Sequence, residues 1–396
     1  MNTTSRVGAI LVSLMFVFMV IPACSAASDT EMQSLEADAA VSNNPVVVFS
    51  SESNNSLKYD SLDTNVIEMK ANNSLSEVKS GDIVILDDSW TAAKETSSLA
   101  VDIYQAVSKG APVIISSDST NLIDEVGKHL GSVSYIDDAQ FYGVAYSETS
   151  GVKFNYSVGG FDSTEDALVE AYNWANTVLS SESTLTQTNG FDLSQLGDET
   201  LCQFSYNCGD FGVMSGSNLY YSLDDSSANY NYYLTHYRFQ ATPSPNHSIA
   251  DMVVYGTPAA ASPSGQTQQL YDYEPKAVAG GISIPIKLTA GLTDAGFNLG
   301  AEVLWTFNIP AVTHHDNSMI GSNIMDHWFE FDERQNAAYN AYMVEPGNVV
   351  KVSTGVDGAY HTTEEFRTTF CKVVVPGAWH NTFTEFTTTV HNTIYP

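Results

Sequence analysis

Histidines and carboxylates gather in one stretch of the second half of the chain, where they could together bind a divalent metal ion. The candidate ligands are His314, His315, Asp316, Asp326 and His327. Imidazole nitrogens and carboxylate oxygens suit zinc and similar ions. Their spacing follows no metal signature, and adjacent residues such as His314 and His315 point to opposite faces of a strand. Strand residues without a metal are the simpler interpretation, and no cofactor is predicted.

A second group of residues that could do chemistry stands at the ends of apolar runs in the first half of the chain. Asp87, Asp88 and Asp118 follow strand-like segments, and α/β folds bind ligands at the carboxyl ends of their strands. The sequence contains neither a Gly-rich phosphate loop nor a G-x-S-x-G nucleophile turn. A hydrolase site at these strand ends therefore remains an alternative, and a sheet without catalysis is favoured.

The sharpest local pattern is a two-armed alternation of apolar and polar residues over 281–310, with a turn at 293–296. Each arm is long enough to cross a bilayer as a β-strand, which takes about 9–11 residues. A hairpin with one apolar and one polar face could join copies of itself into a closed membrane barrel. The apolar positions that could face lipid are Ile282, Ile284, Ile286, Leu288, Phe297, Leu299, Val303 and Trp305.

The run from Gly280 through Ile284, followed by Gly291, Leu292 and a polar alternating arm, resembles the stem hairpin of the leukocidin and α-hemolysin class of β-barrel pore-formers. The resemblance covers this hairpin only, and it implies membrane insertion by several copies. The region in front of the hairpin departs from that family's usual plan, and Pro285 would remove one ladder hydrogen bond. The alternative is a long hairpin whose apolar face packs on a sandwich core.

The elements that would position these residues fall into two regions. Strand-like and helix-like segments alternate over 45–182, which predicts an N-terminal parallel α/β sheet domain with helices at about 91–108, 120–130 and 163–180. A polar segment over 183–195 is the predicted linker. Beyond it the hydrophobic period changes to two, which predicts an antiparallel β-sandwich-like domain over 196–396. The predicted fold class is thus α/β plus mainly-β.

The N-terminus has the layout of a secretory signal peptide over residues 1–27. A basic residue, Arg6, precedes a short apolar run and small residues, and cleavage is expected after Ala26 or Ala27. A second possibility is that Cys24 carries a lipid and tethers the chain to the cell surface. Residues 28–44 read as a linker. Either outcome predicts an extracellular protein.

The charge balance limits the possible partners. The chain has 46 acidic and 15 basic residues, a net charge of −31, and removal of the signal with Arg6 makes the mature chain more negative still. Such a surface repels nucleic acid and anionic lipid headgroups. A protein, glycan or membrane partner stays open, as does a homo-oligomer.

Cysteines and glycosylation sequons add expectations that depend on export. Cys202 and Cys208 are the preferred disulfide pair, with Cys371 as a buried thiol, although a long-range bridge to Cys371 stays open. Four sequons would matter if the organism glycosylates exported proteins, at Asn54, Asn72, Asn155 and Asn246.

Taken together, these features favour an exported, acidic, non-enzymatic surface or secreted interaction protein. One alternative is a pore-former that inserts the 281–310 hairpin. The other is an extracellular hydrolase with its site at the α/β strand ends.

Overall fold

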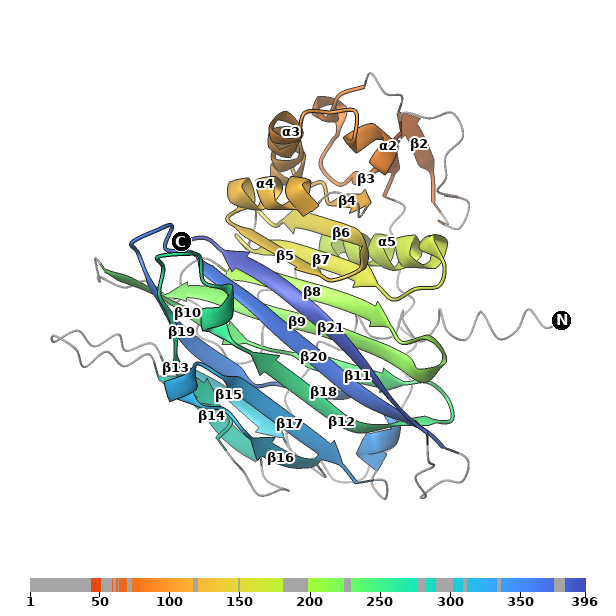
Figure 1. Cartoon of the computed structure of the whole chain (residues 1–396). Helices are drawn as coiled ribbons and strands as arrows, with labels where there is room; N and C mark the ends of the chain where they lie inside the picture. The colour runs from red at the N-terminus through yellow and green to blue at the C-terminus, as the bar shows by residue number, and fades with distance from the viewer. Residues whose placement is uncertain are drawn as a thin grey trace.

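The fold was obtained as a computed structural model. It describes residues 44–50, 59, 62, 64–69, 73–116, 120–148, 150–180, 199–223, 229–276, 312–332, 336–373 and 382–396, and the backbone of 283–289 and 302–308. Within these ranges the chain is mainly β, in mixed and antiparallel sheets (Figure 1). The predicted signal peptide, with Cys24, lies outside the described residues. No helix among those described is long and apolar enough to cross a membrane.

Two large sheets and one separate hairpin account for the described strands. Sheet A runs in the order β13-β19-β10-β9-β8-β7-β6-β4-β3-β1-β2, with β11 paired to β9 and β18. Sheet B runs in the order β16-β17-β12-β20-β21-β5. The strands of sheet A are β1 (Val46–Phe49), β2 (Val66–Met69), β3 (Ile83–Leu86), β4 (Val113–Ser116), β6 (Ala139–Tyr146), β7 (Lys153–Gly159), β8 (Glu199–Asn207), β9 (Gly212–Leu223), β10 (Tyr230–His236), β11 (Phe239–Pro243), β13 (Gln268–Glu274), β18 (Tyr342–Val344) and β19 (Gly347–Ser353).

The remaining elements are sheet B, the hairpin and the helices. Sheet B contains β5 (Ser132–Ile136), β12 (His247–Gly256), β16 (Val312–Asp316), β17 (Met325–Phe331), β20 (Tyr360–Lys372) and β21 (Phe383–Ile394). The hairpin pairs β14 (Ser283–Thr289) with β15 (Glu302–Asn308). The helices are α2 (Asp88–Thr91), α3 (Thr96–Ser108), α4 (Thr120–Leu130) and α5 (Thr164–Ser180), with short 3-10 turns η2 (Leu75–Glu77), η6 (Gly209–Phe211), η7 (Pro258–Ala261), η8 (Ile320–Ser322) and η9 (Asn336–Tyr339).

The N-terminal end of sheet A is covered by helices on both faces, as the apolar runs predict. Strands β2, β1, β3 and β4 are parallel. Val47 packs in one core cluster with residues of α3 and α4, whereas its neighbour Val46 packs in a second cluster with residues of α5. Because successive side chains of a strand point to opposite faces, both faces of β1 are buried.

The α/β region and the β-rich region do not have separate sheets, because sheet A continues from the first into the second. Strand β4 pairs antiparallel with β6, β6 with β7, and β7 runs parallel to β8, which begins the β-rich region. The sheet is therefore mixed rather than parallel. An exposed β7 would present a row of unpaired backbone groups, and pairing with β8 satisfies them. The predicted linker over 183–195 lies outside the described residues.

Sheets A and B face each other across an apolar layer, as the sandwich prediction implies. Phe204 and Phe239 of sheet A each lie near Phe366 of sheet B, with ring centroids 5.1 and 5.2 Å apart. Strand β5, expected in the α/β sheet, instead forms the edge of sheet B and pairs with β21. Sheet A and sheet B therefore each contain strands from both the α/β region and the β-rich region.

Helix α3 begins later than its apolar spacing suggests. The side chain of Glu95 accepts hydrogen bonds from the N–H groups of Ser97 and Ser98 and so caps the helix. The residues before it form the short helix α2, which Asp87 caps. Gly110, with φ of 83°, follows the end of α3.

Gly143→Ala should destabilise the packing of α5 on sheet A. An added Cβ at this position would overlap the indole of Trp174, which is buried and stacked on Tyr156 at 5.0 Å. Overpacking of this kind costs about 1–3 kcal/mol. We expect a lower midpoint of thermal unfolding. Gly321→Ala is the control, because nothing lies within 4 Å of its added Cβ; an equal effect of both changes would contradict this account.

Candidate functional site

The hairpin forms its own two-stranded sheet, hydrogen-bonded to neither sheet A nor sheet B in the described residues. Its register places Ile284 opposite Phe307, Ile286 opposite Trp305 and Leu288 opposite Val303. Directly opposite residues of an antiparallel pair share a face. One face of the β14–β15 ladder therefore carries these apolar residues, as the alternation predicts.

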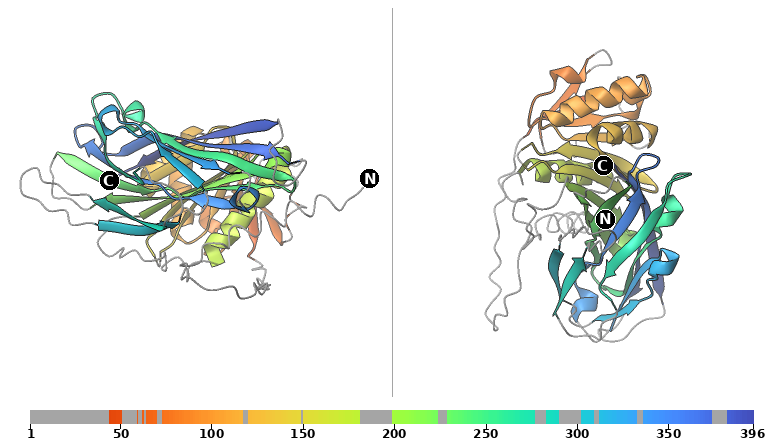
Figure 2. Two further views of the ribbon diagram at one scale, coloured as in Figure 1. Left: turned by 90° about the horizontal axis from the view of Figure 1, so that it is seen from below. Right: turned by 90° about the vertical axis from the view of Figure 1, so that its left-hand side faces the viewer.

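The backbone of the hairpin lies beside sheet A, on the side away from sheet B. β14 approaches β13 and β19, and both views of Figure 2 place the pair there. Neighbouring residues Val349 and Val350 of β19 are both fully buried, so both faces of this strand are covered. Of the candidate lipid-facing residues, Ile282, Phe297 and Leu299 lie outside the described part of the chain.

The root of the hairpin is the place where β13 leads into it and β16 leads out. The hydroxyl of Tyr273, on β13, donates to Asp316 Oδ2 on β16 at 3.2 Å. The ring of Tyr273 also lies against His327, with centroids 5.9 Å apart. Tyr273 therefore ties the two ends of the hairpin segment together. The sequence patterns gave no signal for this role, because the contact joins residues far apart in the chain.

Two of the candidate metal ligands meet at this root as a buried histidine pair. His314 Nε2 lies 3.1 Å from His327 Nδ1, which is a hydrogen bond whose donor depends on the tautomers. His314 is 5% exposed and His327 is fully buried. Burial lowers the pKa of His314 to about 4, against an opposing effect of Asp316. Burial likewise holds the pKa of His327 well below its usual value. The pair is therefore neutral at pH 7.

Two of the other metal candidates, His315 and Asp326, make separate contacts. His315 stacks on Trp328 with centroids 4.4 Å apart and pairs with Glu330 at the surface. The backbone N–H of Asp326 donates to Ser318 Oγ at 2.9 Å. Among the described residues no group of three or more His, Cys, Asp or Glu could hold a metal ion. The strand alternation that separates His314 from His315 is the physical reason.

The expected disulfide is not formed. Cys202 and Cys208 are buried free thiols, and the buried thiol of Cys371 donates to the carbonyl of Lys372. Cys202 lies within the extended strand β8 and Cys208 directly follows it, so the six-residue separation spans about 20 Å. A disulfide needs Cα atoms within about 7 Å. Burial raises the pKa of the Cys208 thiol to about 12, which keeps it protonated and unreactive.

The four sequons have different settings. Asn155 is 2% exposed and its side-chain amide donates to Ser132 Oγ at 2.9 Å, so the folded chain cannot carry a glycan there and this expectation is corrected. Asn246 is exposed, in a turn with φ of 66°, and its sequon stays a prediction. Asn54 and Asn72 lie outside the described residues.

The strand-end carboxylates act locally in the described structure. Asp87 Oδ1 accepts from the N–H of Ser89 and caps α2. Asp88 Oδ2 accepts from the hydroxyl of Ser116, at the end of β4, at 2.9 Å. Asp118 lies outside the described residues. The contacts of Asp87 and Asp88 are those of a helix cap and a strand-end tie, and the hydrolase alternative gains no support from them.

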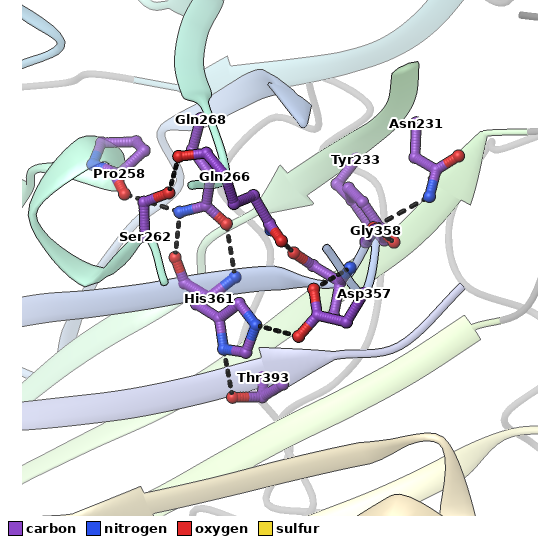
Figure 3. A network of polar contacts seen from close by, with 11 residues as sticks. Asn231, Tyr233, Pro258, Ser262, Gln266, Gln268, Asp357, Gly358, His361 and Thr393 are labelled. Atoms are coloured by element: carbon purple, nitrogen blue, oxygen red, sulfur yellow. Dashed lines mark hydrogen bonds and ion pairs between the residues drawn. The ribbon is translucent and has the colours of Figure 1, made fainter. Parts of the chain in front are cut away.

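A polar network joins the two sheets near the start of β20 (Figure 3). Gln268 of sheet A donates to the carbonyl of His361 at 2.6 Å and accepts from its N–H at 2.8 Å. The His361 ring contacts Thr393 Oγ1 and Asp357 Oδ2, at 3.1 and 3.0 Å. A hydroxyl, imidazole and carboxylate in this order could activate a nucleophile.

Thr393 is nevertheless poorly placed for catalysis. It pairs in register with His361 on one side and with Val133 on the other. The backbone N–H groups around it belong to two ladders and do not form an oxyanion hole. We interpret this network as a tie between sheets A and B.

A buried carboxyl group lies between the sheets. Glu364 of β20 accepts hydrogen bonds from the hydroxyls of Tyr220 and Tyr237, at 2.7 and 2.6 Å. Asn392 and Thr362 donate to it as well. Burial raises the pKa of Glu364 to about 7, and these hydrogen bonds oppose the rise. Sequence analysis missed Glu364, although its place on the inward face of β20 between Thr362 and Phe366 was a readable signal.

Comparison with known proteins gives a partial likeness only. No family model matches the chain, and no curated protein matches it. Three solved structures are a "Pore forming protein" (TM-score 0.32, 7% identity, 49% of this chain and 91% of that one), Clostridium perfringens delta-toxin (0.32, 10%, 48% and 89%) and the Clostridium perfringens NetB toxin in its membrane-inserted form (0.26, 7%, 48% and 93%). The function must rest on this chain's own residues.

Glu364→Gln should remove a pH-dependent component of stability. The folded protein holds the Glu364 proton more tightly than the unfolded chain, so stability should fall as the pH rises from about 4.5 through 7, by up to about 1.4 kcal/mol per pH unit. Chemical denaturation at a series of pH values measures this slope. Glu365→Gln, on the opposite face of β20, is the matched control; a slope unchanged in the Glu364 variant would refute the assignment.

Proposed function

We propose that this protein is an exported, non-enzymatic pore-former whose 281–310 hairpin leaves its position beside sheet A and inserts in a membrane. The observation that carries the proposal is the register of β14 and β15, which gathers Ile284, Ile286 and Leu288 on one face with Phe307, Trp305 and Val303. A strand that lines a membrane pore needs this alternation, with the apolar face toward lipid and the other toward water.

Insertion requires several copies of the chain. A lone hairpin has two outer edges with unpaired backbone groups, and each unpaired group costs several kcal/mol in lipid. Closure of a ring of hairpins removes these edges. A homo-oligomer in the membrane is therefore part of the proposal.

The resting position of the hairpin supports a soluble precursor. β14 lies against β13 and β19 without joining their ladder, so release of the hairpin breaks no strand pairing of sheet A. The sandwich and the α/β end can stay folded while the hairpin moves. The ends of β13 and β16 that adjoin the hairpin would act as hinges.

The charge of the chain indicates the target lipid. A protein with 46 acidic and 15 basic residues is repelled by anionic headgroups. We expect zwitterionic membranes to be the target. Dye release from phosphatidylcholine vesicles tests this directly. No leakage at any protein concentration or pH would end the pore-forming proposal and leave the broader alternative, a secreted or surface interaction protein with a protein or glycan partner.

Trp305→Lys should abolish dye release, whereas Thr306→Lys should not. The two residues are neighbours on β15 and face opposite sides of the ladder. A lysine on the lipid side costs about 2–4 kcal/mol in each copy at the bilayer midplane, and a lysine on the water side costs little. Leakage from phosphatidylcholine vesicles measures the difference. Equal leakage by the two variants would contradict insertion of this hairpin.

A further inference from the structure

The buried pair of His314 and His327 stands at the root of the hairpin, and its hydrogen bonding suits neutral rings better than charged ones. One N–H joins the two rings across 3.1 Å. The outer nitrogens, His314 Nδ1 and His327 Nε2, are buried and make no hydrogen bond. Any added proton therefore creates a buried positive charge whose new N–H has no acceptor, which is costly. A second proton would place two N–H groups against each other.

The pair is tied to both ends of the hairpin segment. His314 lies on β16, directly after the hairpin, and His327 lies on β17 against Tyr273 of β13, directly before it. Tyr273 also donates to Asp316. Movement of either ring to reach water would disturb the contacts of Tyr273 that hold the two ends of the hairpin segment together.

We propose that the His314–His327 pair is an acid-sensitive latch: protonation opens the root of the hairpin and frees the hairpin from sheet A. This inference rests on the proposed function, because it names the trigger for the same hairpin. Above about pH 6.5 both rings are neutral and the latch is closed. As the pH falls, water in the open state stabilises the charged rings and the closed state does not.

The groups around the pair bear on its titration. Asp316 favours protonation of His314, whereas His315 disfavours it. His314 in turn disfavours protonation of His327. Lys276 lies over the ring of Tyr273 and pairs with Asp272 and Glu274. The other charged or titratable neighbours, from β17 and from β12 paired beside it, are Asp326, Glu330, Asp251 and Tyr255. Burial outweighs these charges, because the pKa of both histidines is lowered.

The buried carboxyl group of Glu364 responds in the opposite sense. The raised pKa of Glu364 makes its carboxyl group most stable in the protonated form, so acid does not weaken the layer between sheets A and B. Acid should therefore loosen the hairpin root while the Glu364 contacts between the sheets persist. A general acid denaturation would instead disrupt the hairpin root and the layer between the sheets together.

Hydrogen exchange on the mature chain without membranes tests the latch directly. Protection factors of peptides from β14, β15 and β16, corrected for the intrinsic pH dependence of exchange, are compared at pH 7.5 and pH 5.0. With the open-state pKa near 6.5, opening should increase about 30-fold for each histidine that controls it. Peptides from β20 and β21 should keep their protection. Equal protection of the hairpin at both pH values would overturn the proposal.

Variants assign the effect to the pair. His327→Gln and His314→Gln cannot take up the proton and should each reduce the pH response of the hairpin about 30-fold. His315→Gln, at the neighbouring surface position, is the matched control and should respond as the wild type does. If neither buried variant folds, the wild-type profile decides, since opening must begin below pH 6.5 and stay confined to the root and hairpin.

Vesicle leakage separates the latch from the pore. Hairpin release at pH 5.0 without leakage at any pH would leave the latch standing and refute pore formation. Leakage that is the same at pH 7.5 and pH 5.0, with unchanged exchange, would refute the latch alone. Zinc added at pH 7.5 should not change hairpin protection, because the described residues form no metal site of three ligands; zinc-induced protection would overturn the assignment of the pair as a proton latch.

Discussion

Backbone pairing along one continuous sheet is the constraint on which the rest of the structure depends. Along sheet A, from β2 at one end to β13 at the other, each strand pairs with its neighbours across the change from helix-covered to sheet-covered surface. The parallel contact between β7 and β8 is the joint, because without it both strands would have open edges. The β14–β15 hairpin is paired only with itself. It is therefore the described part of the β structure that can move without breaking the ladder of either large sheet.

Polar groups between the sheets are arranged to keep the sandwich in one register. Glu364 gathers donors from both sheets, including Tyr220 and Tyr237. Gln268 clamps the start of β20 through the backbone of His361. A buried polar network is stable only when its members meet, so each contact resists sliding of one sheet over the other. The frame that carries the hairpin is thus fixed by specific bonds as well as by apolar packing.

The pKa shifts of Glu364 and of the histidine pair have opposite signs, and this difference gives the proposed trigger its direction. Burial raises the pKa of Glu364 and lowers the pKa of His314 and of His327. Acid therefore favours the resting form of the sandwich core and disfavours that of the hairpin root. Desolvation is the common cause of these pKa shifts. It favours the neutral form, which is the protonated state of a carboxyl group and the unprotonated state of an imidazole.

The sequence by itself determined the local elements and their faces. Apolar runs gave the strands buried on both sides, the four-residue spacing gave α3, and alternation gave the two faces of the hairpin, because side-chain periods of 2 and 3.6 are properties of the backbone. Only the tertiary structure decided which strands pair, why Cys202 and Cys208 stay apart, and that His314 meets His327. These outcomes depend on contacts between residues distant in the chain, and local periodicity carries no information about partners.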